Sequence, residues 1–242
     1  MIAVILAAGM AKRLRPLTDN KPKCLLKVGD RTLLQRSVDS LVAAGISEFV
    51  VVTGYLSAMI TDFLEEHYPQ LKFHFIDNRD YATTNNIYSL WLARTVVEGR
   101  QFILLDSDLI YDGRIISKVI DEVASVLTVS RHPLGEEEMK VVVDSECRIT
   151  EISKTCDPAA AMGESVGIEK INADYSAALY RELRTMMTDE GLTDVFYELA
   201  FQRLIAQGFS FKVMDVTDFF TIELDTPEDF DNARHLIPKE LY

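Results

Sequence analysis

The sequence contains few of the residues that build disulfide frameworks or zinc sites. Its 242 residues include three cysteines and four histidines. The cysteines are odd in number and show no CxxC spacing, and the histidines are scattered along the chain. Disulfide scaffolds and zinc sites normally show paired, closely spaced ligands. The composition therefore indicates reduced thiols in a cytoplasmic protein and gives no metal-ligand pattern of this kind.

Two common phosphate-binding motifs and any long apolar run are also missing. A P-loop needs GxxxxGK[ST], but Gly9 is the only glycine before Gly29, and the GxGxxG dinucleotide fingerprint is absent as well. No apolar stretch reaches the roughly 18 residues that a membrane span needs. No basic region precedes the first apolar segment, as it would in a signal peptide. Any nucleotide site must therefore use a loop other than a P-loop or a GxGxxG loop, and the sequence predicts neither a membrane span nor a signal peptide.

What the sequence does contain is a concentration of positive charge near its N-terminus. The chain carries a formal net charge of −13, yet residues 1–31 hold seven Lys/Arg against two Asp, a net +5 that leaves −18 elsewhere. A net acidic protein repels nucleic acid and anionic membranes in bulk, so this cluster indicates a focused site for a small anion. The alternative is a solvated basic loop. The position directly after an apolar strand favours the anion site, because ligand crevices in α/β folds open at the carboxyl ends of strands.

The residues between the predicted strand and the positive charges have little or no side chain. Ala7, Ala8 and Gly9 let a ligand approach backbone N–H groups. Five cations follow within fifteen positions, and together they suit a polyphosphate: Lys12, Arg13, Arg15, Lys21 and Lys23.

The rest of the chain alternates strands and helices, and no composition shift or linker divides it. This pattern predicts one α/β domain over residues 1–242, a Rossmann-like three-layer α/β/α fold with a mostly parallel, mixed central sheet. The predicted strands are Ile2–Ala7, Glu48–Thr53, Lys72–Ile76, Phe102–Asp106, Ser125–Ser130, Lys140–Val143, Arg148–Ile152, Ser165–Ile171 and Ser210–Asp215. The predicted helices are Thr32–Ala44, Ser57–His67, Asn86–Arg94, Arg114–Ala124, Ala173–Met187, Asp194–Gln207 and one starting at Thr226-Pro227.

Two acidic pairs are candidate partners of the basic residues. Asp106 and Asp108 end a predicted strand, and Glu223 and Asp225 precede Thr226, a good helix N-cap. Mg²⁺ usually accompanies a nucleoside triphosphate and prefers one or two carboxylates besides phosphate oxygens and water. Each pair has an ordinary alternative, a turn signal for the first and an acidic helix boundary for the second. Together with the basic cluster, the pairs favour metal-assisted phosphoryl or nucleotidyl transfer.

Three N-terminal segments carry a resemblance to a known family. They are Leu6-Ala7-Ala8-Gly9, Arg13-Leu14-Arg15-Pro16-Leu17-Thr18 and Pro22-Lys23-Cys24-Leu25-Leu26, which resemble the LAAG…R-L-x-P-L-T…P-K-x-L signature of sugar-phosphate nucleotidyltransferase-like enzymes. The Asp-x-Asp step, Lys154 and the late Glu-x-Asp extend the resemblance along most of the chain. Residues 84–90, Thr-Asn-Asn-Ile-Tyr-Ser-Leu, are similar to the phosphocholine and 2-aminoethylphosphonate cytidylyltransferase branch rather than to hexose-1-phosphate enzymes.

The resemblance implies a role for each candidate residue. Arg13, Lys23 and Lys154 would be catalytic, and Asp108 and Asp225 would hold Mg²⁺; Asp108 is preferred to its neighbour Asp106 because it matches the family's metal aspartate. The nucleotide would contact Leu6, Ala7, Ala8, Gly9, Lys12, Arg13, Lys23, Asn85, Asn86 and Ser107. The acceptor would contact Glu164, Tyr197, Glu198 and Glu223, with Glu169 as a further candidate.

The acceptor is the least determined part of this interpretation. Residues 194–198 are similar to the element that holds a quaternary ammonium in the phosphocholine branch, and an aromatic face with a carboxylate suits such a cation. The alternative is that Phe196, Leu199, Ala200 and Phe201 form the core face of a helix.

The implied reaction is attack of an acceptor phosphate or phosphonate on CTP, giving a CDP- or CMP-linked product and pyrophosphate. The acceptor oxygen is already anionic, so no general base is needed, and catalysis rests on positioning and charge neutralisation. The nucleotide would lie within about residues 1–110 and the acceptor within about 111–242. The alternatives are a sugar- or polyol-phosphate nucleotidyltransferase using UTP, GTP or dTTP, and a non-catalytic nucleotide-sensing relative. The partners implied are CTP and the acceptor, without nucleic acid or membrane, and a homodimer is left open.

Overall fold

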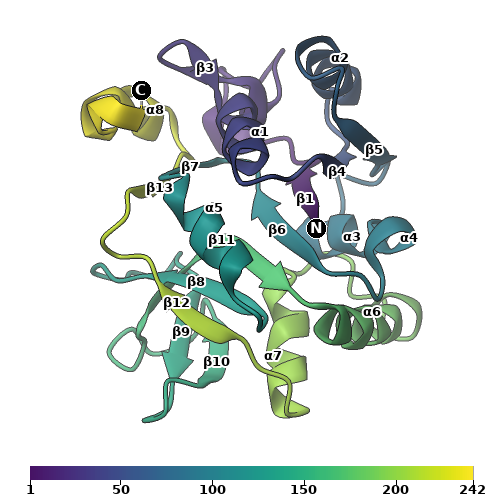
Figure 1. The fold of residues 1–242 in the computed structure, drawn as a ribbon, viewed down its shortest axis with the longest axis vertical. Coiled ribbons are helices and arrows are strands. Elements are labelled where there is room, and N and C mark those ends of the chain that lie inside the picture. The colour runs from purple at the N-terminus through teal and green to yellow at the C-terminus, as the bar shows by residue number, and fades with distance from the viewer. Residues whose placement is uncertain (242) are drawn as a thin grey trace.

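Strand β1 (Ile2–Ala7) is buried along its whole length, and its side chains alternate between two separate cores. Those at positions 2, 4 and 6 belong to one hydrophobic cluster, and those at 3, 5 and 7 belong to the other. Successive side chains of a strand point to opposite faces of a sheet, so β1 must be covered on both faces. The computed structural model, which describes residues 1–241, shows the resulting layers of helices, sheet and helices (Figure 1).

Strand β1 lies within a nine-stranded sheet of order β10-β9-β11-β6-β1-β4-β5, to which β8 adds beside β11 and β12 beside β8. Seven strands run in one direction, whereas β10 and β11 run in the other, so the predicted mostly parallel, mixed sheet is confirmed. The remaining strands of this sheet are β4 (Glu48–Thr53), β5 (Lys72–Asp77), β6 (Phe102–Asp106), β8 (Val126–Ser130), β9 (Lys140–Val143), β10 (Ile149–Ser153), β11 (Gly163–Ile171) and β12 (Lys212–Asp215).

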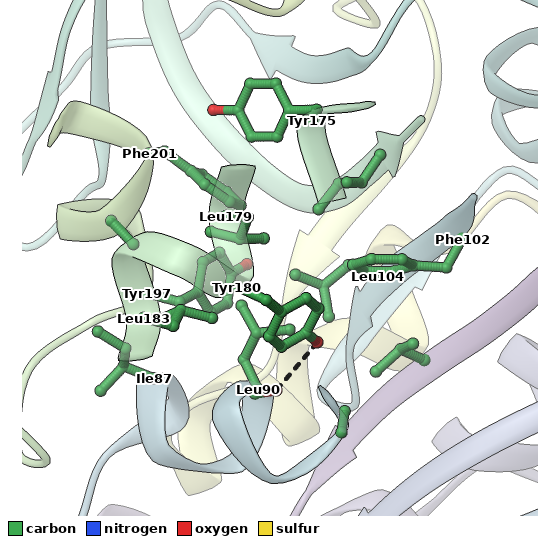
Figure 2. Packing of buried hydrophobic residues seen from close by; sticks show 14 of the residues in the cluster. Ile87, Leu90, Phe102, Leu104, Tyr175, Leu179, Tyr180, Leu183, Tyr197 and Phe201 are labelled. Atoms are coloured by element: carbon green, nitrogen blue, oxygen red, sulfur yellow. Dashed lines mark hydrogen bonds between the residues drawn. The ribbon is translucent and has the colours of Figure 1, made fainter. Parts of the chain in front are cut away.

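Helices cover both faces of the sheet. On one face, α1 (Leu33–Ala43), α2 (Ser57–His67) and α5 (Arg114–Asp121) pack on the odd-numbered side chains of β1. The opposite face is covered by α3 (Asn86–Leu92), α4 (Arg94–Val97), α6 (Ala173–Thr188) and α7 (Glu198–Ala206). Figure 2 shows part of this second core, where the Tyr180 hydroxyl donates to the Leu90 carbonyl at 3.1 Å.

Several smaller elements lie outside the nine-stranded sheet. Strands β2 (Lys27–Val28) and β3 (Arg31–Thr32) form a short hairpin, and β7 (Leu109–Tyr111) pairs with β13 (Thr221–Glu223). Helix α8 (Pro227–Leu236) begins after Thr226, which caps it as the sequence predicts. Three-residue 3₁₀ turns lie at Lys12–Leu14, Lys23–Leu25 and Lys239–Leu241. Within residues 1–241, no helix combines the length and apolar character needed to cross a membrane.

Two predicted helices have different bounds in the structure. The helix expected over residues 86–94 ends at Leu92, and α4 follows it as a separate short helix. The helix expected from Asp194 begins only at Glu198. The reason lies in tertiary contacts of the preceding segment: the Tyr197 backbone N–H donates to the Asn86 side chain at 2.9 Å, and the Thr193 carbonyl accepts from the Asn85 N–H at 2.9 Å. These contacts hold residues 193–197 against the start of α3.

Candidate active site

A cavity of about 590 Å³ opens at the carboxyl ends of β1, β5 and β6. Parallel strands ending at one edge, with loops that diverge there, commonly leave such a crevice in α/β folds. The structure brings all ten sequence-predicted nucleotide positions to its wall: Leu6, Ala7, Ala8, Gly9, Lys12, Arg13, Lys23, Asn85, Asn86 and Ser107. The basic loop (residues 8–31) therefore lies beside a cavity, which Lys12, Arg13 and Lys23 line. Arg15 and Lys21, predicted from the sequence as part of the same cluster, are exposed and do not line it.

Lys23 lies at the centre of the charged groups in this cavity. It starts a 3₁₀ turn directly after Pro22 and is only 9% exposed. Its Nζ donates to Asp108 Oδ2 at 2.9 Å and to Asp225 Oδ1 at 2.6 Å. Burial disfavours its charged form, but the two carboxylates outweigh this and hold the pKa of Lys23 above its ordinary value. Lys23 is therefore an ammonium that links the first acidic pair to the second.

Asp225 also binds Arg13, whose guanidinium donates to the other carboxylate oxygen. Burial of Asp225 favours its neutral form, but Lys23 and Arg13 hold its pKa below the ordinary value. Asp225 therefore stays ionised, and it ties the basic loop to the segment before α8.

The pairing of β7 with β13 brings the late acidic pair to the cavity. Leu109, directly after Asp108, pairs with Glu223, and the Leu224 N–H donates to the Asp108 carbonyl at 3.3 Å. Burial and the neighbouring carboxylates of Asp108 and Asp225 raise the pKa of Glu223 to about 8. The sequence analysis grouped Glu223 with the acceptor, but the structure places it beside the two predicted metal ligands.

Asp108, Glu223 and Asp225 form a candidate metal site. Each offers one carboxylate oxygen, and the three oxygens lie within 4.8 Å of one another. Asp108 Oδ1 is buried and has no hydrogen-bond partner among residues 1–241, which is unusual for a carboxylate. A set of carboxylate oxygens with one unused buried ligand atom fits a hard divalent cation.

Lys154 lines the cavity from outside the basic loop. It follows β10, and its Nζ lies 3.6 Å from Glu137 Oε2 and 4.7 Å from the centroid of the Phe196 ring. Glu164 lies nearby on β11, where its Oε2 is 2.8 Å from His132 Nε2. Residues Glu137, Met139 and Phe196 were not predicted as site residues; the sequence offered a signal only for Phe196, which stands next to the predicted Tyr197.

Glu198 lies at the first position of α7 and is 7% exposed. Its Oε2 is buried without a hydrogen-bond partner in the part of the chain that the structure describes. Burial raises the pKa of Glu198 to about 7. Since buried carboxylate oxygens are normally bonded, this unused acceptor on the cavity wall is available to a ligand that carries a donor or a positive charge.

Tyr197, expected to contact the acceptor, does not line the cavity. Its side chain is fully buried in the core of Figure 2, and its hydroxyl oxygen lies 3.1 Å from Asp106 Oδ2 and 3.4 Å from Glu169 Oε2. Glu169 is also fully buried and does not line the cavity. Of the aromatic residues near the start of α7, Phe196 lines the cavity instead, and Tyr81 lines it from the segment after β5.

Asp106 has a different environment from Asp108. Burial and the surrounding carboxylates, Asp108 first, raise its pKa well above the ordinary value. Gly167, at φ +77°, lies against it, and a Cβ at this position would come within 2.8 Å of Asp106 Oδ2. Asp106 therefore lines the cavity with its Oδ2 close to Tyr197 and β11, whereas Asp108 keeps a buried oxygen without a partner in residues 1–241. Asp108 as the metal ligand stays a prediction.

A buried lysine outside the cavity binds the backbone beside Lys154. Lys140, in β9, is 1% exposed, and its Nζ donates to the carbonyl groups of Lys154 at 2.7 Å, Glu138 at 3.2 Å and Glu136 at 3.4 Å. In the antiparallel register, Lys140 also lies opposite Glu164. One ammonium therefore fixes the backbone of Lys154 and of the loop that carries Glu137.

An α/β domain with a basic loop and paired carboxylates at the carboxyl ends of its central strands is the architecture of a nucleotidyltransferase. Comparison with known families agrees. Residues 3–203 match the MobA-like NTP transferase domain, and the chain belongs to this family.

Individual relatives are more distant. The chain is 29% identical over 240 residues to the bifunctional IPC transferase and DIPP synthase of Aquifex aeolicus, covering 98% of this chain and 52% of that protein. It is 26% identical over 234 residues to the CMP-5'-(3-aminopropyl)phosphonate synthase of Streptomyces rubellomurinus, and the match covers 94% of this chain and 37% of that protein. The chain thus spans about half of the first relative and less of the second. The solved structure of CTP:phosphocholine cytidylyltransferase from Streptococcus pneumoniae shares the fold, with a TM-score of 0.83 at 21% identity over 98% of this chain and 99% of that one.

Proposed function

We propose that the protein is a Mg²⁺-dependent cytidylyltransferase. It joins CTP to a small aminoalkyl phosphate or phosphonate, such as phosphocholine or 2-aminoethylphosphonate, and releases pyrophosphate. The nucleotide lies within about residues 1–110 and the acceptor within about residues 111–242. Two of the similar proteins are a synthase of a CMP-linked aminopropylphosphonate and a cytidylyltransferase for phosphocholine, which supports CTP and an amine-bearing acceptor.

The observation that carries this proposal is the distribution of charge in the cavity. Lys12, Arg13 and Lys23 line the wall from the basic loop, whereas Lys154, Glu164 and Glu198 line it from the segment after β10, from β11 and from α7. In all, seven carboxylate residues and four cationic residues line the wall, so the cavity is net acidic even though it offers a polyphosphate site. An acceptor that is anionic at its reacting end and cationic at its far end matches this arrangement.

The chemistry requires positioning rather than a general base. The acceptor oxygen is already anionic at neutral pH, attacks the α-phosphorus in line, and pyrophosphate leaves. Arg13 and Lys23 neutralise the triphosphate, Lys154 binds the acceptor phosphate or the reacting α-phosphate, and Asn85 or Asn86 reads the base edge. Asp108 and Asp225, with Glu223 beside them, would hold Mg²⁺, which neutralises charge on the reacting phosphates.

Pyrophosphate release over a grid of substrates tests the proposal. Four nucleotides (CTP, UTP, GTP and dTTP) are each paired with phosphocholine, 2-aminoethylphosphonate and hexose 1-phosphates in the presence of Mg²⁺. We expect turnover with CTP and an amine acceptor. Turnover only with another nucleotide and a sugar phosphate would assign the chain to the sugar-phosphate enzymes, and nucleotide binding without turnover of any pair would indicate a nucleotide sensor.

A further inference from the structure

A second cavity lies beside the active site. Its volume is about 740 Å³, and it is bounded by β10, the segment before α7 and the first two turns of α7. It shares four wall residues with the active site, which are Met139, Lys154, Phe196 and Glu198. The two cavities therefore meet at Lys154 and Glu198, which the proposed function assigns to the acceptor, and at two apolar neighbours.

The walls of the second cavity are largely apolar. Phe196 is 40% exposed and Leu199 is 36% exposed, and both belong to the few large apolar side chains that solvent reaches in residues 1–241. Val195 and Met139 extend this surface. An apolar group that entered this hollow would remove these side chains, and its own surface, from water.

The uncharged polar groups of the wall are already engaged within the chain. Gln202 Oε1 accepts from the Ile152 N–H at 2.7 Å, and the Thr150 hydroxyl donates to the Val142 carbonyl at 3.3 Å. The Ser153 hydroxyl is bonded to that of Thr155 at 2.8 Å. Each of these side chains therefore already uses one hydrogen-bonding group inside the chain, and the wall offers a ligand mainly apolar surface and charged groups.

The charges of this wall are predominantly negative. Glu151, Asp194 and Glu198 face a single cation, Lys154, whose Nζ lies over the Phe196 ring. Glu198 stands at the junction with one buried carboxylate oxygen that no described residue bonds. A ligand that carries a positive charge at the junction and an apolar body beyond it complements both features.

We infer that the second cavity receives an apolar substituent on the acceptor's ammonium group. The inference rests on the proposed function and specifies its substrate class: amino-alcohol phosphates or aminoalkylphosphonates whose nitrogen carries an alkyl chain or ring larger than methyl. The phosphate lies at Lys154, the ammonium lies at Glu198, and the substituent extends past Phe196 to Leu199.

Two acceptors of equal charge test the inference. They are phosphocholine and its analogue in which one N-methyl group is replaced by N-hexyl. We expect the KM of the hexyl compound to be lower by about tenfold or more, since burying methylene groups is favourable, with little change in kcat. A Leu199→Arg variant should abolish this difference; the readout is the ratio of the two KM values, because a guanidinium next to Glu198 acts equally on the ammonium group that both acceptors carry.

The matched control is Leu236→Arg, which places the same substitution on an exposed helical leucine outside both cavities; it should preserve the preference. A hexyl compound with an equal or higher KM, or a preference that survives Leu199→Arg, would overturn the inference while turnover of phosphocholine upheld the proposed function. Failure of both amine acceptors under all conditions would overturn the two together.

Discussion

The ammonium group of Lys23 lies 2.6 Å from a carboxylate oxygen of Asp225, although the two residues are 202 positions apart in the chain. Such a nearly buried ion pair is weak evidence of stabilisation, because desolvation offsets much of the attraction. Its position at the carboxyl ends of the central strands, with Asp108 as second partner, instead indicates a functional cluster. It joins the basic loop to both acidic pairs before any substrate is bound.

Loss of either side of this cluster should disable the enzyme. We expect Lys23→Ala and Asp108→Ala each to lower turnover at least about a hundredfold, roughly 3 kcal/mol of transition-state stabilisation, because charge on the reacting phosphates is then left uncompensated. Steady-state pyrophosphate release measures this. The exposed residues Lys118 and Asp62 lie on α5 and α2 away from the cavity, so their alanine variants serve as controls. Near-normal turnover in either cluster variant would contradict the assigned roles.

Lys140→Met tests whether the buried lysine positions Lys154. The substitution leaves three carbonyl groups without their donor, at a cost of about 1–3 kcal/mol for each buried polar group left unpaired. We expect kcat/KM for the acceptor to fall about tenfold, while the KM for CTP changes less than about twofold, because the contacts of Lys140 are confined to the acceptor end.

Lys170→Met is the matched control for that substitution. Lys170 is 2% exposed and caps the carbonyl groups of Ile120 and Glu122, away from the cavity. It should lower the thermal midpoint in a similar way without a specific effect on the acceptor, and Lys140→Arg should partly restore acceptor kinetics. Equal effects of Lys140→Met on both substrates would show that Lys140 acts through stability alone.

The pH dependence of acceptor binding should report the ionisation of Glu198. Burial raises its pKa in the folded protein to about 7, so the carboxylate that attracts an ammonium forms mainly above this pH. We expect the acceptor KM to fall roughly tenfold between pH 6 and pH 8 through this group. In the Glu198→Gln variant, the part of the KM change that comes from Glu198 should be absent. Any part that comes from ionisation of the acceptor's own phosphate should be the same in the variant and in the unmodified protein. An unchanged profile in Glu198→Gln would refute the role of Glu198.

The same raised pKa predicts an effect on stability. When the pKa of a carboxyl group is higher in the folded protein than in the unfolded chain, the folded protein becomes less stable as the pH rises. The loss begins near the pKa of the unfolded chain and is complete above the pKa of the folded protein. Glu198→Gln should therefore raise the thermal midpoint relative to the unmodified protein at pH 8 and change it little at pH 4. Thermal unfolding at the two values measures this, and a lower midpoint at pH 8 would contradict it.

Thr226 should contribute to stability through helix α8. Its side chain accepts from the Asp229 N–H, and Asp229 in return accepts from the N–H groups of Thr226 at 2.7 Å and Asp225 at 2.9 Å. Thr226→Ala should cost about 1 kcal/mol of unfolding free energy, measured by urea denaturation. Thr188→Ala, at the exposed last position of α6, is the control and should cost less. A neutral Thr226→Ala would mean that the cap adds nothing to folding.

Much of this architecture is local in origin and could be predicted. The alternation of strands and helices, the basic loop after β1 and the Thr226 cap depend on residues that are neighbours in the chain. Strand ends of a parallel sheet meet at one edge, so even the convergence of Asp108 with Lys23 could be anticipated from topology. The structure confirms the fold and places these groups in one cavity.

Other features depend on contacts between distant segments, which no local pattern encodes. The start of α7 at Glu198 is set by hydrogen bonds to Asn85 and Asn86, and this start decides that Phe196 lines the cavity while Tyr197 enters the core. The pairing of β7 with β13 places Glu223 beside Asp108, and the ammonium of Lys140 fixes a backbone fourteen residues away. The sequence by itself determined which helices and strands form and where charged residues cluster along the chain, because hydrophobic periodicity and local charge depend on residues that are close in sequence. Only the tertiary structure decided which side chain faces the ligand, because that depends on packing across the whole fold.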